Sequence, residues 1–295
     1  MGDVVKLAAG NLRLDLRPDL GGGIARFQYG DGPDAIDLMR PAAEAPVAAG
    51  ELSCYPLVPV SNRIVDGKLK FRGETIEMAL NFGDHPHHIH GHGWQGAWSV
   101  AAQGPASATL VFGYARRGAT YAYRASQTFT LDGVRLTVDM AVMNFADGAM
   151  PFGLGLHPYF DLTPEATLTA RAEAVWLNDE RMAPTDREPV PEGWDFSAGR
   201  AVADTGLDNC FAGWDGRARI AWPERDAALA IEADPAFGHL IVYTPAHGNY
   251  FCVEPVTNAN DGFNQMESGR DDTGTVVLEP SESFSGRVTF TAEVG

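Results

Sequence analysis

The chain has 295 residues, of which 45% are hydrophobic and 21% are charged, a composition that excludes a disordered chain. Its 39 acidic side chains against 22 Lys and Arg give a formal net charge of −17, which would repel nucleic acid and anionic lipid surfaces. The sequence shows no leader peptide and no apolar run of the roughly 18 residues that a membrane span needs. We therefore expect a cytoplasmic protein without nucleic-acid or membrane partners.

Short runs of alternating apolar and polar residues predict strands along the whole chain, and 33 glycines and 19 prolines separate them. One short stretch near the N-terminus, residues 33–39, is a plausible helix, and no strand–helix–strand alternation recurs. The sequence therefore predicts one all-β domain over residues 1–295, built as a large antiparallel sandwich. The predicted strands cover residues 12–16, 69–76, 108–114, 228–233, 239–243 and 287–294.

The clearest predicted element is a β-hairpin over residues 121–145. Two alternating runs meet at residues 131–133, where Asp132 and Gly133 favour a tight turn. Alternate residues of the second run share one face and should be buried: Val134, Leu136, Val138, Met140 and Val142.

Five of the eight histidines lie within residues 85–92. In an extended chain His88, His90 and His92 would point to one side, where imidazoles can bind a metal or a polar ligand. No acidic residue follows until Asp132, so the nearby carboxylate of a cupin-type metal site is missing. Ligand recognition without a metal, a purely structural role and a metal site remain open at this point.

The residues around these histidines favour recognition of a ligand. Gly91 and Gly93 remove side chains beside the imidazoles, so that backbone could approach a ligand closely. Trp94 and Trp98 offer flat apolar faces for the ring of a ligand.

Two further segments place single titratable side chains among apolar neighbours. His157 precedes Pro158, which restricts it to extended geometry and fixes its direction. Glu254 lies in an apolar, strand-like run, where burial would raise its pKa and where a carboxylate is costly unless it is paired or functional. Cys54, Cys210 and Cys252 are scattered and odd in number, which predicts buried thiols and no disulfide framework.

In order along the chain, five short motifs resemble the landmarks of the aldose 1-epimerase (galactose mutarotase) family. The resemblance extends over nearly the whole chain and implies the family's β-supersandwich, a large antiparallel all-β fold. The motifs are Asn62-Arg63-Ile64, His90-Gly91, His157-Pro158-Tyr159-Phe160, Leu207-Asp208-Asn209 and Val253-Glu254-Pro255.

The resemblance implies a role for each matching residue. His157 corresponds to the general acid, Glu254 to the general base and His90 to a histidine that assists at the sugar ring. Arg63 and Asp208 correspond to groups that bind sugar hydroxyls. The implied reaction opens and recloses the ring of an aldose, and it requires no metal and no other cofactor. Because a carboxylate favours a nearby imidazolium, we expect His157 to be charged.

The sequence also departs from the family pattern. Many members have His-Gly-Gly where this chain has His90-Gly91-His92-Gly93-Trp94, so we expect a divergent branch whose preferred sugar is not fixed. His85, His87, His88 and His92 have no implied role, and the protein could act as a monomer or a homodimer.

Four alternatives remain at this stage. One is a carbohydrate-binding protein without catalysis. A second is a sugar-phosphate 1-epimerase, for which the pair Arg116-Arg117 is a weak signal. A third is a glycosidase that uses Asp208 and Glu254. The fourth is a metal-dependent dioxygenase.

Overall fold

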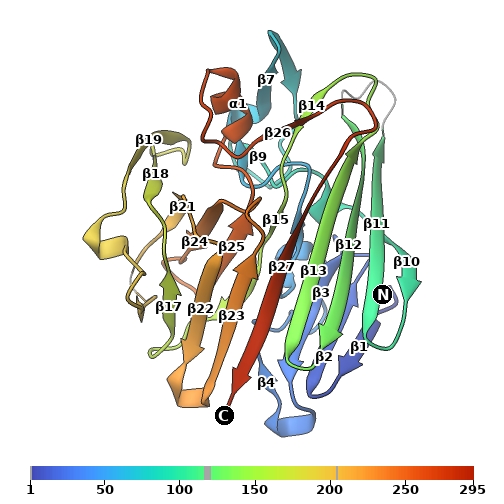
Figure 1. Cartoon of the computed structure of the whole chain (residues 1–295), viewed down its shortest axis with the longest axis vertical. Helices are drawn as coiled ribbons and strands as arrows, with labels where there is room; N and C mark the ends of the chain where they lie inside the picture. Colours follow the sequence, from blue (N-terminus) through green and yellow to red (C-terminus); the bar gives the residue numbers. More distant parts are fainter. Residues whose placement is uncertain (1, 116–120, 204) are drawn as a thin grey trace.

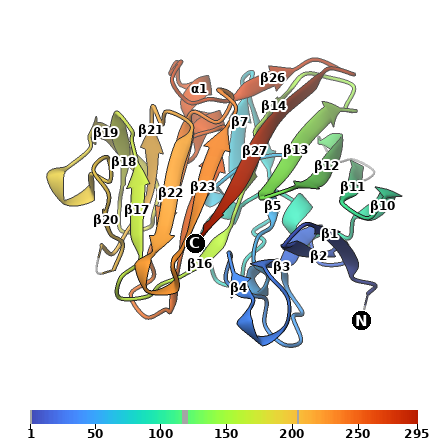
Figure 2. The same ribbon diagram turned by 60° about the horizontal axis from the view of Figure 1, so that its bottom comes forward.

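The computed structural model describes residues 2–115, 121–203 and 205–295, and these residues form an almost entirely β-structured chain (Figure 1). The expected all-β class is confirmed. Figure 2 shows strands β17, β22, β23, β27 and β13 side by side in one twisted sheet. The pair Arg116-Arg117 lies outside the described residues.

The nine-stranded sheet is antiparallel throughout. Its strands in spatial order are β10 (Ser99–Gln103), β11 (Ser107–Ala115), β12 (Ala122–Asp132), β13 (Arg135–Asn144), β27 (Ser283–Val294), β23 (Ala227–Ala233), β22 (Arg217–Trp222), β17 (Thr167–Ala170) and β20 (Arg200–Ala201).

A second antiparallel sheet has eight strands and carries most of the predicted motifs. Its strands are β19 (Pro184–Pro189), β18 (Ala174–Asn178), β21 (Asp208–Ala212), β24 (His239–Tyr243), β25 (Tyr250–Val256), β15 (Gly155–Leu156) and β5 (Pro56–Leu57), with β16 (Tyr159–Asp161) also paired to β25.

The remaining described strands form smaller antiparallel sheets. They are β1 (Val5–Ala9), β2 (Leu12–Arg17), β3 (Gly23–Tyr29) and β4 (Ile36–Asp37) in one sheet, and the pairs β14 (Met150–Phe152) with β26 (Val276–Leu278), β6 (Arg63–Ile64) with β9 (His88–Ile89), and β7 (Lys68–Phe71) with β8 (Glu74–Glu77).

Helical structure is scarce, as expected, and none of the described helices could span a membrane. A short α-helix, α1 (Gly262–Glu267), was not predicted. The other helical segments are 3₁₀ turns: η1 (Gly32–Asp34), η2 (Ala49–Glu51), η3 (Val65–Gly67), η4 (Gly93–Gln95), η5 (Glu192–Trp194) and η6 (Pro223–Arg225).

The hairpin prediction is confirmed, with one exception. Strands β12 and β13 pair along their length, from Tyr123 opposite Asn144 to Asp132 opposite Arg135. Leu136, Val138, Met140 and Val142 are buried, whereas Val134 is 42% exposed because it lies in the turn and not in the strand.

Two other local predictions were wrong. Residues 33–39 form no helix: the 3₁₀ turn η1 ends at Asp34, and β4 then pairs with β3. Residues 69–76 are not one strand, because Arg72 and Gly73 adopt positive φ angles of 51° and 81° and turn the chain between β7 and β8.

The main hydrophobic core lies between the two large sheets, and strands β24 and β25 separate it from a smaller cluster. Phe251 and Val253 point into the main core, whereas Cys252 and Val256 belong to the smaller cluster on the opposite face. Glu254 is on the same face as Cys252, because side chains two residues apart along a strand share a face. That this fold extends as one domain over residues 1–295 stays a prediction.

Candidate active site

A cavity of about 780 Å³ lies over the face of β24 and β25 that points away from the main core. Ile241, Tyr243, Tyr250 and Glu254 of these strands line it. Residues from many other segments complete the wall: Asp19, Leu20, Gly21, Val47, Ala48, Ala49, Gly50, Glu51, Tyr55, Asn62, Arg63, Phe82, His85, Ile89, His90, Trp94, Gln95, His157, Tyr159, Met182 and Asp208. All five residues predicted for the site therefore line one cavity.

Strand register brings His157 and Glu254 together. Gly155 pairs with Val256 and Tyr159 pairs with Cys252, and the same antiparallel register places His157 opposite Glu254. Side chains that face one another across an antiparallel pair are close neighbours. The Nε2 atom of His157 lies 3.3 Å from Oε1 of Glu254, and both residues are buried at the cavity wall.

Two tyrosine rings fix the plane of the His157 imidazole. Tyr55 stacks on it at a centroid distance of 4.6 Å and Tyr159 at 4.7 Å, and the two tyrosine rings are themselves neighbours at 6.1 Å. The backbone N–H of His157 also donates to the carbonyl of Tyr55 at 2.9 Å. Nδ1 of His157 and Oε2 of Glu254 are buried without a hydrogen-bond partner in the described chain, so both groups retain unused binding capacity.

Burial changes the proton affinity of both members of this pair. It lowers the pKa of His157 to about 3 and raises the pKa of Glu254 well above its usual range, with the negative charge of Asp208 adding to the rise. Our expectation of a charged His157 was therefore wrong, because desolvation outweighs the attraction of the carboxylate. Both shifts favour the uncharged forms, the neutral imidazole of His157 and the protonated carboxyl group of Glu254.

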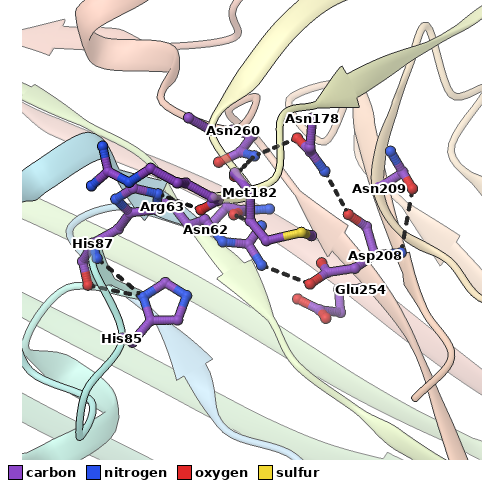
Figure 3. A network of polar contacts seen from close by, with 12 residues as sticks. Asn62, Arg63, His85, His87, Asn178, Met182, Asp208, Asn209, Glu254 and Asn260 are labelled. Carbon is purple, nitrogen blue, oxygen red and sulfur yellow. Dashed lines mark hydrogen bonds and ion pairs between the residues drawn. The ribbon is translucent and has the colours of Figure 1, made fainter. Parts of the chain in front are cut away.

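Arg63 and Asp208 form a second polar group in the cavity (Figure 3). Nη2 of Arg63 donates to Oδ2 of Asp208 at 2.7 Å, and Nη1 donates to Oδ1 of Asn62 at 3.0 Å. Asn178 donates to the backbone carbonyl of Asp208 at 2.8 Å and accepts from Asn260 at 3.1 Å. Asn62 and Asp208 thus hold the Arg63 guanidinium, and Asn178 holds the backbone of Asp208.

The segment after Glu254 holds the Asn62-Arg63 motif in place. Asn258 Oδ1 accepts from the backbone N–H of Ser61 at 3.1 Å, and Asp261 N–H donates to the carbonyl of Arg63 at 3.0 Å. Asp261 Oδ1 in turn accepts from Val65 N–H at 2.9 Å. The polar residues that follow Glu254 in the sequence therefore position Arg63.

His90 enters the cavity from the end of β9. Its N–H donates to the carbonyl of Asn62 at 2.8 Å, and its positive φ of 59° turns the chain out of the extended conformation. The His90 ring meets the His157 ring edge to face at a centroid distance of 5.3 Å and the Trp94 ring at 5.7 Å. Burial lowers the pKa of His90 well below its usual value, which favours the neutral imidazole.

Of the other histidines of residues 85–92, His88 and His92 are neighbours, with ring centroids 5.4 Å apart. His88 Nδ1 lies 2.7 Å from the carbonyl oxygen of Ala79, and the His92 ring stacks on Tyr114 at 3.8 Å. The expectation of one shared face was wrong for His90, because the turn at its positive φ brings its ring to His157, whereas the His88 and His92 rings remain neighbours. Within the described chain these three do not form a group of metal donors.

His85 and His87 connect the cavity wall to a neighbouring loop. His85 lines the cavity, and its Nδ1 is 3.2 Å from the backbone nitrogen of His87 (Figure 3). His87 is fully buried: Nδ1 accepts from Asp66 N–H at 3.1 Å, and Nε2 lies 2.8 Å from the carbonyl oxygen of Arg181. His87 therefore ties the loop that carries Met182 to the segment after Arg63.

The expectation that Gly91 and Gly93 admit a ligand was also wrong. A Cβ atom at Gly91 would lie 2.4 Å from the carbonyl oxygen of Val58, and one at Gly93 would lie 2.3 Å from a methyl group of Val58. Both glycines make room for the chain at Val58. Trp94 lines the cavity as expected, but Trp98 lies in the main core with its Nε1 bonded to the carbonyl of Gly93 at 2.9 Å.

Gly91→Ala is expected to lower the free energy of unfolding by about 2–4 kcal/mol. Two costs add: an alanine is strained at the positive φ of this position, and its Cβ would overlap with Val58. Gly133→Ala is the matched control: Gly133 also has a positive φ, of 59°, but a Cβ there meets no atom within 4 Å. The control should therefore be destabilised only by the backbone strain, by about 1–2 kcal/mol. Urea denaturation of both variants measures the difference, and equal losses would contradict the packing role of Gly91.

Comparison with known proteins places the chain in a family. The family model for aldose 1-epimerase matches residues 3–291. The chain belongs to the aldose 1-epimerase family. It is 33% identical over 98% of its length to the uncharacterized protein YphB of Escherichia coli K12, covering 99% of that protein. It is 25% identical over 91% of its length to the uncharacterized protein YihR of the same organism, covering 90%.

Solved structures show the same fold. A candidate aldose 1-epimerase from Escherichia coli K12 matches with a TM-score of 0.91 and 30% identity, over 99% of both chains. A galactose mutarotase-like protein from Clostridium acetobutylicum matches with a TM-score of 0.85 and 20% identity, over 98% of this chain and 95% of the other. The expected galactose mutarotase-like fold is thus confirmed.

The sequence prediction missed several residues that line this cavity. Tyr55, Tyr243, Tyr250 and Met182 line the cavity but were not proposed. Tyr250 was within reach of prediction, because it lies four residues before Glu254 in the same strand and so shares its face. Tyr55 and Met182 carried no sequence signal, since neither belongs to a motif or to an alternating run.

Proposed function

We propose that the protein is an aldose 1-epimerase that interconverts the α and β anomers of an unphosphorylated aldose. The observation that carries the proposal is the 3.3 Å contact between His157 Nε2 and Glu254 Oε1 in the wall of an open cavity. Ring opening of a hemiacetal needs a base at the C1 hydroxyl and an acid at the ring oxygen. A carboxylate and an imidazole that share one proton meet both needs.

The proposed reaction uses this one proton in both directions. The proton passes from Glu254 to His157, which gives the imidazolium and the carboxylate. Glu254 then removes the proton of the C1 hydroxyl while His157 protonates the ring oxygen, and the bond between C1 and the ring oxygen breaks. The C1–C2 bond of the open aldehyde rotates by half a turn, and reclosure with reversed roles gives the other anomer. His90 lies against His157 and would contact the sugar ring.

The charges of the cavity favour a neutral sugar. Four of the residues that line it are acidic, Asp19, Glu51, Asp208 and Glu254, whereas Arg63 is the one lysine or arginine among the described lining residues. The Arg63 guanidinium is already paired with Asp208. A phosphorylated sugar would need a cation that is not neutralised. Arg63 and Asp208 instead suit a sugar hydroxyl group. It can accept a hydrogen bond from the Arg63 guanidinium and donate one to the Asp208 carboxylate.

A panel of freshly dissolved single anomers tests the function. Hexoses and pentoses are followed by optical rotation with and without the protein, and by NMR exchange between anomers at equilibrium. We expect faster mutarotation for at least one unphosphorylated aldose. Sugar binding without acceleration would support a carbohydrate-binding protein instead. Release of monosaccharide from a disaccharide would support a glycosidase, although the ion pair with Arg63 makes Asp208 a poor second catalytic carboxylate.

A further inference from the structure

We infer that His157 and Glu254 of the cavity wall, together with Cys252 buried beside them, also form a binding site for a zinc ion. The donor atoms of these three buried residues all lie within 4.8 Å of one another. They are the one such metal-donor group found in the described chain. Zinc bound there would occupy the groups that the epimerase reaction uses and would inhibit it.

Strand register explains why the thiol joins the pair. Cys252 lies two residues before Glu254 on the same face of β25, and it pairs with Tyr159, two residues after His157. The thiol is thus the side-by-side neighbour of Glu254 and the diagonal neighbour of His157. All three side chains come from rigid, buried backbone, so the group exists before any ion arrives.

The distances suit a tetrahedral ion. Two N or O ligands about 2.0–2.1 Å from one zinc lie about 3.3–3.4 Å apart at the tetrahedral angle. His157 Nε2 and Glu254 Oε1 are 3.3 Å apart. The thiol needs only a small movement to complete a set of three protein ligands, with the fourth position open to the cavity.

The chemistry of the donors selects the metal. A thiolate and an imidazole favour zinc over magnesium and calcium, which prefer oxygen ligands. Glu254 Oε2 and His157 Nδ1 are both buried without a partner, so the site has unused binding capacity. A Zn²⁺ ion with one thiolate and one carboxylate is neutral overall, which offsets the cost of a buried carboxylate.

Binding should release protons, because the ligands must be deprotonated. The Cys252 thiol loses its proton to solvent as its bond to zinc forms. Zinc affinity should therefore increase with pH, by as much as about tenfold per pH unit for each proton released.

The test measures zinc binding directly and does not depend on sugar turnover. Chelator-treated protein is titrated with Zn²⁺ in competition with a coloured chelator, and with Co²⁺ followed by absorption. We expect one equivalent of zinc and, with cobalt, a near-ultraviolet thiolate-to-metal charge-transfer band. If a sugar substrate is found, Zn²⁺ should inhibit mutarotation reversibly, and the sugar should weaken zinc binding by the same factor.

Cys252→Ser should lose the cobalt charge-transfer band and weaken zinc binding at least tenfold. Cys210→Ser is the matched control: Cys210 is also a buried free thiol close to Glu254, but it is not part of the donor group. The control should retain both properties. If Cys252→Ser does not fold by circular dichroism, Cys252→Ala replaces it. Absence of stoichiometric zinc, or equal binding by the Cys252 variant and the control, would overturn the site while leaving the epimerase proposal standing.

Discussion

Glu254→Gln is expected to lower kcat/KM for mutarotation by about 10²–10⁴, the usual contribution of a positioned general acid or base. Glutamine keeps the shape of the side chain but cannot accept the C1 hydroxyl proton. The loss should appear mainly in kcat, because Arg63 and Asp208, the proposed sugar-binding groups, are unchanged. Optical rotation with the sugar identified in the anomer panel measures it.

The same substitution should not destabilise the fold. The pKa of Glu254 is raised in the folded protein, so its folded state binds the proton more tightly than the unfolded chain does. Protonated Glu254 therefore stabilises the fold fully at pH values below the usual pKa of a glutamate. This contribution is lost as the pH rises through the raised pKa of Glu254 in the folded protein. Glutamine does not titrate, so the variant should gain stability relative to the wild type as the pH rises.

An exposed carboxylate provides the control for Glu254→Gln. Glu232 lies on β23 in the other large sheet and its side chain is 62% exposed. Glu232→Gln should leave both the rate and its pH dependence unchanged. Wild-type turnover by Glu254→Gln would remove the proposed base.

The parts of the fold that follow from local pattern could be predicted. The hairpin of β12 and β13 shows strict alternation and a turn sequence, and only Val134, inside the turn, was placed wrongly. The helix proposed for residues 33–39 failed for a physical reason. So short a segment gains little from its own hydrogen bonds, and pairing of Ile36 with Tyr29 satisfies the backbone instead.

The residues of the site could be named from sequence motifs, but their arrangement could not. His157 and Glu254 meet because two antiparallel pairings, Gly155 with Val256 and Tyr159 with Cys252, share one register. Nothing in either segment indicates which distant strand it pairs with. The direction of His90 depends on a positive φ angle at a residue other than glycine, which alternation cannot reveal.

The charge of the catalytic pair shows a second limit of sequence reasoning. A histidine beside a carboxylate suggests an ion pair when the surroundings are unknown. The structure buries both groups in the cavity wall, with two tyrosine rings packed on His157, and desolvation dominates their proton affinities. Burial is set by residues such as Tyr55, which lies about a hundred positions before His157 in the sequence.

His157→Asn is expected to cause a loss of about 10²–10⁴ in kcat/KM, because the ring oxygen would lose its acid. The double variant His157→Asn/Glu254→Gln decides whether the two residues act as one unit. If they share a single proton, the double variant should lose little more than either single variant does. Losses that multiply would show two independent contributions and would contradict the shared proton.

The pH dependence of stability gives a second readout that does not involve catalysis. The pKa of His157 is lowered to about 3 in the fold, so between pH 6.5 and 3 the unfolded chain takes up a proton that the folded protein does not. His157 therefore contributes a loss of stability as the pH falls through this range, opposite in sign to the contribution of Glu254. Urea denaturation at pH 7 and pH 5 should show a smaller decrease for His157→Asn than for the wild type. An equal decrease in the two proteins would mean that folding does not lower the pKa of His157, so that its ring is exposed to water. A solvent-exposed imidazole would contradict the buried acid of the proposed reaction.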